Sequence, residues 1–92
     1  MRVVYTERAL ADLSIILEYI GSNHPTAYAG FELRMAMIAR RIGRWPESAE
    51  QVGSRPGVRV VPMIRYPYKV FYRVAGDIVE ILYIHHAARR AP

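Results

Sequence analysis

The apolar side chains between residues 10 and 45 recur at steps of three and four, and this period constrains the fold more than any other feature of the chain. The first run predicts a helix over residues 7–20, with Thr6 as its N-cap. A second run follows Pro25, which suits the first position of a helix, and Pro46 ends it. The apolar seam of that second helix consists of Tyr28, Phe31, Met35, Ile38, Ile42 and Trp45. Two amphipathic helices with so short a joint predict an antiparallel helical hairpin.

The pattern changes after a loop over residues 46–57 that is rich in Pro, Gly, Ser and Glu. Val, Ile and Tyr then dominate three segments separated by turn residues, which predicts an antiparallel meander over 58–65, 68–74 and 78–85. Residues 3–5 add a strand before the helices. Pro62 lacks an N–H group, so its strand should lie at an edge of the sheet. The expected fold is α+β with the order β-α-α-β-β-β, in which the helical hairpin packs on one face of a four-stranded, mainly antiparallel sheet.

Length and composition narrow the class of protein. Ninety-two residues are enough for a single domain spanning 1–92, and such a domain has a thin stability margin. The chain has no cysteine, which excludes a disulfide framework or a thiolate zinc site. No apolar run is long enough to span a bilayer, and the first residues do not resemble a signal peptide. We therefore expect a cytoplasmic protein without a membrane partner, a cofactor or a metal.

Positive charge is concentrated in the middle of the chain. The net charge is +5, and residues 34–65 alone contain seven arginines and two acidic residues. Lys69 is the one lysine among thirteen basic residues, and arginine suits planar, bidentate contacts to phosphate or carboxylate. This composition favours a polyanion or an acidic protein segment as the partner. A solvated basic face that only aids solubility is the alternative.

Strand alternation suggests which charged side chains share a face. It groups Arg59 and Arg65 with Val61 and Met63, Lys69 and Arg73 with Phe71, and Glu80 with Leu82, Ile84 and His86. A turn of two or four residues would place Arg73 and Glu80 on the same face, which we prefer because it collects the charges on the uncovered side. An ordinary cross-strand ion pair is the alternative role for these two residues. Arg55-Pro56-Gly57-Val58-Arg59 reads either as a corner that grips an anion or as a solvated loop.

The histidines near the end of the chain are the remaining candidates for chemistry. His85 and His86 are adjacent and should point to opposite faces, so they cannot easily share a metal ion. His86 suits general acid–base work, with Arg89 and Arg90 nearby to stabilise phosphate charge. An ordinary histidine at a strand end is the alternative.

Several short motifs follow one another in an order and spacing typical of a known family. The first is Ala9-x-x-Asp12-Leu13-x-x-Ile16-x-x-Tyr19-Ile20, followed by Pro25, Phe31 and Trp45-Pro46. Next come Arg55-Pro56-Gly57-Val58-Arg59 and Tyr66-Pro67-Tyr68-Lys69-Val70-Phe71-Tyr72-Arg73-Val74. Val79-Glu80-Ile81-Leu82 and His86-Ala87-Ala88-Arg89 complete the pattern. Over nearly its whole length the chain resembles the ParE/RelE toxin superfamily and looks closest to the ParE, or plasmid-stabilisation, branch.

This resemblance implies the toxin component of a type II toxin–antitoxin system with the fold predicted above. It also implies a cognate antitoxin, encoded beside the toxin, that wraps an acidic and apolar segment around it in a hetero-oligomer. ParE-like members poison DNA gyrase, whereas RelE-like members cut mRNA in the ribosome with a basic cluster and a late Tyr or His. The chain has no aromatic residue after His86 and a single lysine, so we expect a gyrase inhibitor that acts by binding, not an enzyme.

The resemblance also marks site residues. Those expected to bind the target or the antitoxin are Arg55, Arg59, Arg65, Lys69, Arg73, His86 and Arg89. If the chain is instead a ribosome-dependent endoribonuclease, the catalytic candidates are Arg59, Arg73, His86 and Arg89. An inactive, partner-binding remnant is a third reading, because Tyr83 stands where many relatives have arginine and His85 where many have an aliphatic residue.

Overall fold

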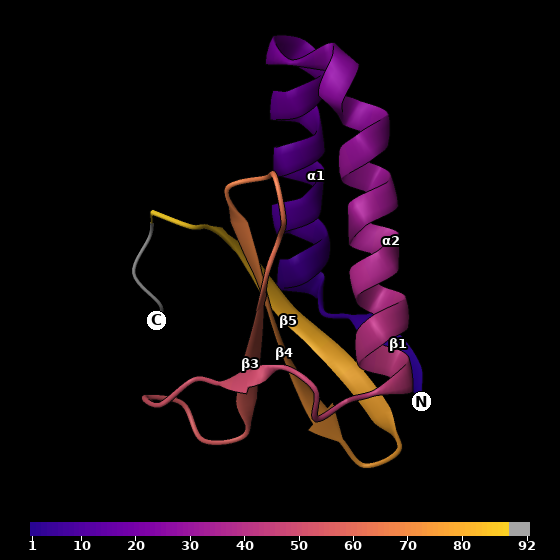
Figure 1. Ribbon diagram of the computed structural model, residues 1–92, viewed down its shortest axis with the longest axis vertical. Coiled ribbons are helices and arrows are strands. Elements are labelled where there is room, and N and C mark those ends of the chain that lie inside the picture. The colour runs from indigo at the N-terminus through magenta and orange to yellow at the C-terminus, as the bar shows by residue number, and fades with distance from the viewer. Residues whose placement is uncertain (89–92) are drawn as a thin grey trace.

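The computed structural model describes residues 1–88 and confirms the α+β architecture (Figure 1). The elements are β1 (Arg2–Tyr5), α1 (Glu7–Asn23), a 3-10 turn η1 (Pro25–Ala27), α2 (Tyr28–Arg44), β2 (Glu50–Gln51), β3 (Val58–Pro62), β4 (Tyr68–Ala75) and β5 (Ile78–His86). The sheet has the order β1-β5-β4-β3-β2, with β1 parallel to β5 and the other pairs antiparallel. It therefore contains five strands instead of the four predicted, because two residues of the loop pair with Arg59 and Val60 as β2.

The two helices begin and end close to where local sequence predicts. The Thr6 hydroxyl accepts from the Ala9 N–H at 3.1 Å and caps α1. The helix continues to Asn23, three residues beyond the predicted end, and Pro25 begins the 3-10 turn instead of α2 itself. Arg41 and Arg44 lie in the last turn of α2, where positive charge suits the helix dipole.

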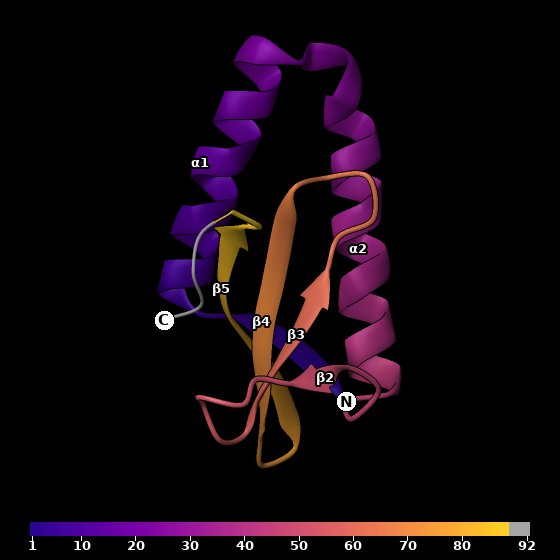
Figure 2. The ribbon, with the colours of Figure 1, turned by 60° about the vertical axis from the view of Figure 1, so that its left-hand side comes forward.

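Both helices cover one face of the sheet, and the main core lies between the two layers (Figure 2). Phe31 of α2 is fully buried and meets Tyr66 and Tyr68 edge to face, with ring centroids 5.6 and 5.7 Å apart. The prediction that Trp45 completes the apolar seam is wrong. Trp45 follows the last residue of α2, its side chain is 57% exposed, and Arg44 lies over its ring at 4.8 Å.

The β4–β5 turn has the short form that was preferred. Gly76, with φ of 63°, and Asp77 form a two-residue connection, so Arg73 pairs directly with Glu80. Pro62 pairs with Lys69 on one side, and β2 ends before it can reach Pro62 on the other. The prediction that its strand lies at an edge of the sheet is therefore wrong, because β3 pairs with β4 on one side and with β2 on the other, and only Pro62 itself extends past β2.

A β-bulge in β5 changes the faces that simple alternation assigns. Tyr72 pairs with Ile81 and Phe71 pairs with Tyr83, so Leu82 is the extra residue. Ile81 and Ile84 both pack in the core under the helices, whereas Leu82 and Tyr83 both pack on the other face. The predicted grouping of Glu80 and Leu82 with Ile84 and His86 is therefore wrong beyond Leu82.

Candidate functional site on the uncovered face of the sheet

The face of the sheet opposite the helices carries a small apolar cluster of its own. Val58, Phe71 and Tyr83 are buried there, with Val52, Val60 and Leu82 packed around them. The rings of Phe71, Tyr83 and His85 form a compact aromatic group. The Tyr83 and His85 rings stack at 4.7 Å, and Phe71 lies 4.9 Å from Tyr83 and 5.4 Å from His85.

Two arginines lie over this aromatic group. The Arg8 guanidinium is 4.6 Å from the centre of the Tyr83 ring, and its Nη2 lies 2.9 Å from Nε2 of His85. Because a guanidinium can only donate, Nε2 is the acceptor of this hydrogen bond. Arg55, from the loop before β3, lies over the same ring at 5.9 Å. Stacking of this kind stabilises both partners through cation–π attraction.

These side chains surround a hollow of about 480 Å³ at the start of α1. Its lining includes Arg8, Arg55 and Arg73 together with Val58 and Tyr83. Arg73 donates to the Glu80 carboxylate at 2.9 Å, which is the predicted ion pair, and its side chain is about half exposed. The Tyr83 hydroxyl is buried and has no hydrogen-bond partner among residues 1–88. Three arginines and a tyrosine with an unsatisfied hydroxyl therefore line the same hollow.

Of the predicted binding residues, Arg55, Lys69 and Arg73 lie on this face. Arg59 does not, because it alternates with Val58 and Val60 and so points to the helix side. Its guanidinium donates to the carbonyl oxygens of Glu47 at 3.2 Å and Ala49 at 2.7 Å, which ties the loop after α2 to the sheet.

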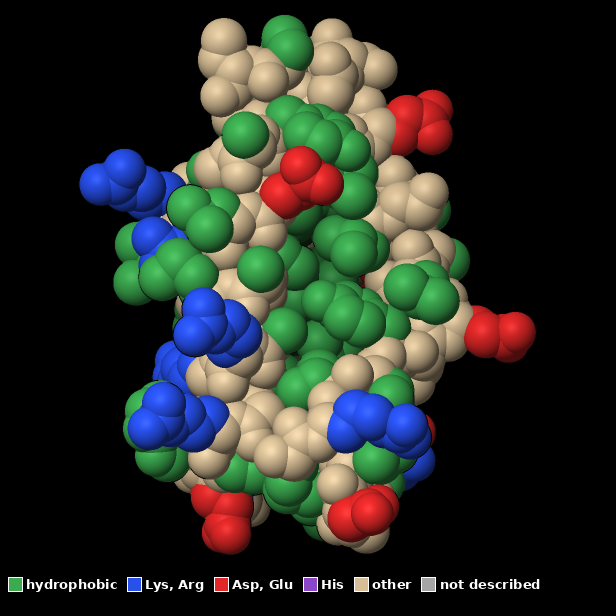
Figure 3. Space-filling model, turned by 90° about the vertical axis from the view of Figure 1, so that its right-hand side faces the viewer, with side chains coloured by type: hydrophobic (Ala, Val, Ile, Leu, Met, Phe, Trp, Pro, Cys, Tyr) green, Lys and Arg blue, Asp and Glu red, His purple; other side chains and the backbone are tan. Residues whose placement is uncertain are grey.

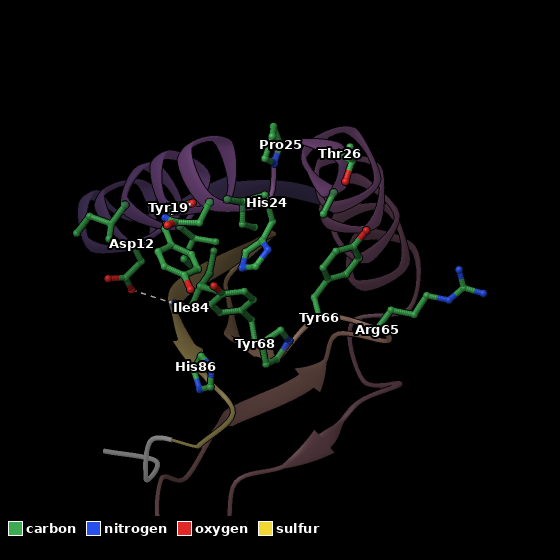
Figure 4. A pocket seen from close by; sticks show the side chains of 16 residues that line it. Asp12, Tyr19, His24, Pro25, Thr26, Arg65, Tyr66, Tyr68, Ile84 and His86 are labelled. Atoms are coloured by element: carbon green, nitrogen blue, oxygen red, sulfur yellow. Dashed lines mark hydrogen bonds between the residues drawn. The ribbon is translucent and has the colours of Figure 1, made fainter.

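Arg65 and His86 also lie away from the uncovered face, beside a larger groove on the helix side (Figure 4). Arg65 follows the end of β3, has a φ of 74° and is exposed. The bulge turns His86 toward the groove, where it meets Tyr68 edge to face at 5.5 Å, and its Nδ1 accepts from the Ala88 N–H. Arg59, Arg73 and His86 are therefore not brought together, and Arg89 and Arg90 lie outside the described residues.

The groove itself has a volume of about 990 Å³ and runs between α1, η1 and the turn before β4. Its rim includes Ile15 and Tyr19, which are 68% and 52% exposed. Burial raises the pKa of Tyr68 at its base, and the nearby Tyr19 raises it further. The groove is thus mainly apolar and holds no cluster of basic side chains like that over Tyr83.

A second basic surface lies along α2. Figure 3 shows Lys and Arg side chains gathered mainly along one flank of a strip of hydrophobic side chains on the side of the molecule where α2 lies. Four arginines belong to that helix, namely Arg34, Arg40, Arg41 and Arg44. Arg41 is held by the Oγ and carbonyl oxygen of Ser48, both at 3.2 Å. The basic charge predicted for the middle of the chain is therefore divided between two sides.

Sequence reasoning missed Arg8 and Tyr83 as site residues. Arg8 is in the first turn of a helix, with no local sign that its side chain reaches a strand 77 residues later. Tyr83 would point under the helices if β5 alternated regularly, and only the bulge brings it to the uncovered face. His85 and His86 do point to opposite faces, and no group of three or more His, Cys, Asp or Glu side chains able to hold a metal occurs within residues 1–88. No helix in this part of the chain is long and apolar enough to cross a membrane.

Comparison with known proteins agrees with the fold and identifies a family. The family model described as the ParE toxin of the type II toxin–antitoxin system parDE matches residues 3–91. The protein named Toxin RelE2 from Caulobacter vibrioides is 39% identical over 89 residues, which cover 96% of this chain and 97% of that protein.

Solved structures resemble the chain at lower identity. A chain from the chromosomal ParDE system of P. aeruginosa superposes with a TM-score of 0.80 at 24% identity, covering 94% of this chain and 95% of that one. The isolated E. coli RelE toxin superposes with a TM-score of 0.62 at 17% identity, covering 97% and 86%. At these identities the likeness establishes the shared fold.

Proposed function

The chain belongs to the ParE toxin family of type II toxin–antitoxin systems, and from this premise we propose that it arrests growth by binding DNA gyrase and that a cognate antitoxin neutralises it. The observation that carries the choice of gyrase is the separation of the residues an RNA-cutting toxin would need. Arg59 is bound to loop carbonyls on the helix side, Arg73 lies on the uncovered face and His86 borders the groove. General acid–base catalysis requires its groups within hydrogen-bond reach of one substrate.

The aromatic group on the uncovered face does not replace that catalytic set. Tyr83 and His85 are 4% and 3% exposed, and Arg8 contacts both rings. A phenol or imidazole so covered cannot exchange protons with a bound RNA unless the arginine leaves. The face is better suited to binding, because guanidinium groups surround a partly apolar surface.

A basic, ninety-two-residue toxin also fits a partner that neutralises it by binding. A domain of this size buries only about 60% of its unfolded surface, so a bound protein adds stability to a thin margin. An acidic antitoxin segment would associate quickly with a chain of net charge +5. Because DNA gyrase acts on DNA inside the cell, this proposal implies that the protein is cytoplasmic.

The test is supercoiling of relaxed plasmid by purified gyrase. The toxin is added alone or after mixing with the acidic protein encoded by the neighbouring reading frame. We expect the toxin to inhibit supercoiling and the partner to restore it. Arg73→Gln should weaken inhibition, whereas Arg34→Gln on α2 is the matched change of charge away from the uncovered face. Wild-type supercoiling at toxin concentrations that stop growth would contradict the choice of gyrase.

Ribosome-dependent RNA cleavage is the second candidate, favoured by the 39% identity to a protein named Toxin RelE2. It predicts in-frame cuts in translated mRNA that disappear in His86→Ala. Intact transcripts in growth-arrested cells would exclude it. Normal growth on induction, with antitoxin binding retained, would instead indicate the partner-binding remnant.

A further inference from the structure

We propose that the hollow over Tyr83 binds a single carboxylate, presented by an acidic and apolar segment of a partner protein. The proposal rests on the toxin function above, because the antitoxin is the partner expected to supply such a segment. It adds Arg8 and Tyr83 to the binding face and gives Arg55 and Arg73 a common ligand.

The donors come from three distant parts of the chain and line one hollow. Arg8 lies in the first turn of α1, Arg55 in the loop before β3 and Arg73 in β4. Arg55 donates no side-chain hydrogen bond to any described residue, and its guanidinium lies over the Tyr83 ring at 5.9 Å. Its five N–H groups are therefore available in the planar arrangement that carboxylates accept in pairs. Arg8 uses one of its N–H groups on His85 and retains the others.

Tyr83 supplies an observation that is independent of charge. Its side chain lines the hollow at 4% exposure, and its buried hydroxyl lacks a partner within residues 1–88. A buried hydroxyl without a hydrogen bond is unfavourable, and such groups are rare in folded proteins. Arg8 is exposed and Arg55 half-buried, so both can move from the ring to a ligand oxygen and open a path to the hydroxyl.

The surroundings favour a protein carboxylate over a nucleic-acid phosphate. The aromatic rings are buried, so they offer no open platform on which bases could stack. Glu80 pairs with Arg73 at 2.9 Å and neutralises part of the positive charge, so the hollow suits one carboxylate better than the row of charges on a nucleic-acid backbone. Val58 and Leu82 also line the hollow, so the neighbours of the bound acidic residue should be apolar.

The experiment titrates the full-length labelled toxin with the peptide acetyl-Leu-Glu-Leu-amide at physiological ionic strength, followed by NMR of the Arg Nε–H and Tyr ring signals. We expect saturable shifts at Arg55 and Tyr83, and none of comparable size with acetyl-Leu-Gln-Leu-amide. Arg55→Gln and Tyr83→Phe should each weaken binding by about ten- to a hundredfold, the factor that one hydrogen bond to a charged group contributes. Arg40→Gln on α2 is the matched control and should bind as the wild type does.

Equal binding of the two peptides, or wild-type affinity in both Arg55→Gln and Tyr83→Phe, would overturn the proposal. Tighter binding of a short oligothymidylate at the same signals, lost in Tyr83→Phe, would overturn it in favour of a nucleic-acid site. The peptide titration and its NMR readout do not depend on the toxicity of the protein. If the toxin inhibits gyrase but does not bind the peptide, carboxylate binding at the hollow is refuted and the proposed function stands. If it binds the peptide but does not inhibit gyrase, the proposed choice of gyrase is refuted and the carboxylate site stands.

Discussion

Asp12 provides the sharpest test of how α1 supports the sheet. β1 pairs with β5 only as far as Tyr5 and Ile81, so the second half of β5 has no strand on that side. α1 takes over the hydrogen bonds of this edge, and Oδ2 of Asp12 accepts from the buried N–H of Ile84 at 3.0 Å (Figure 4). In Asp12→Ala the N–H of the buried Ile84 loses this hydrogen-bond partner at the wall of the groove.

The expected cost follows from the kind of bond that is lost. A hydrogen bond to a charged group contributes roughly 1.5–3 kcal/mol, and an unsatisfied buried donor costs a similar amount. Asp12 is half-buried, which limits the loss, so we expect Asp12→Ala to lower the free energy of unfolding by about 2 kcal/mol. A chain of this size has a total stability of roughly 5–14 kcal/mol, so the change is large enough to measure.

Urea denaturation followed by circular dichroism measures this change. Asp12→Asn keeps an acceptor oxygen without the charge and should lose about half as much. Glu18→Ala is the control, because Glu18 is exposed on the same helix and makes no side-chain hydrogen bond or ion pair with any of residues 1–88. If Asp12→Ala lies within about 0.5 kcal/mol of that control, the bond to Ile84 does not hold the edge of β5 as we argue.

Three other changes test separate parts of the fold. Thr6→Ala removes both the cap of α1 and the 2.8 Å bond from Thr6 to the Leu82 carbonyl, and should lower the free energy of unfolding by about 1–2 kcal/mol in the same urea assay. Gly43→Ala should destabilise by about 1–3 kcal/mol despite its better helix propensity, because a Cβ there would lie 2.9 Å from Val3; an unchanged melting temperature would contradict the tight approach of α2 to β1. Burial raises the pKa of Tyr5 above its usual 10.0, so the folded chain holds that proton longer than the unfolded chain does. The contribution of neutral Tyr5 to stability is therefore fully present below pH 10.0 and is lost as the pH rises through the raised pKa. Tyr5→Phe should lose less free energy of unfolding than the wild type over that pH range in pH-dependent denaturation.

Local sequence predicted the parts of the fold that depend on local forces. The cap at Thr6 and the apolar period of the two helices arise from contacts a few residues apart. The sequence therefore predicts the ends of both helices to within about three residues. The short turn at Gly76 and Asp77 is likewise a local choice, and it placed Arg73 opposite Glu80 as expected.

The errors come from interactions between distant parts of the chain. Arg59 donates to the carbonyl oxygens of Glu47 and Ala49. These two residues belong to a loop, and no periodicity in the sequence specifies the path of that loop. β2 exists because the same loop passes the edge of β3. The bulge at Leu82 adds one residue to β5 without any change in its composition, so alternation alone assigns each later side chain to the wrong face.

That bulge connects the support of the sheet to the candidate site. Counted from Ile81, strict alternation would put Tyr83 under the helices and Ile84 on the uncovered face. The extra residue reverses both, so that Ile84 joins the core and Tyr83 moves beneath the arginines.

The start of α1 holds the bulge in place from both sides. The Thr6 hydroxyl donates to the Leu82 carbonyl, and the Asp12 carboxylate accepts from Ile84 two residues later. Arg8 lies between these two anchors on the same helix and reaches Tyr83 and His85. Because the anchors and Arg8 share one rigid helix, a change that releases β5 from α1 must also shift the guanidinium over Tyr83. Asp12→Ala should therefore weaken carboxylate binding at the hollow even though Asp12 does not line it, and unchanged affinity in this variant would separate the bulge from the site.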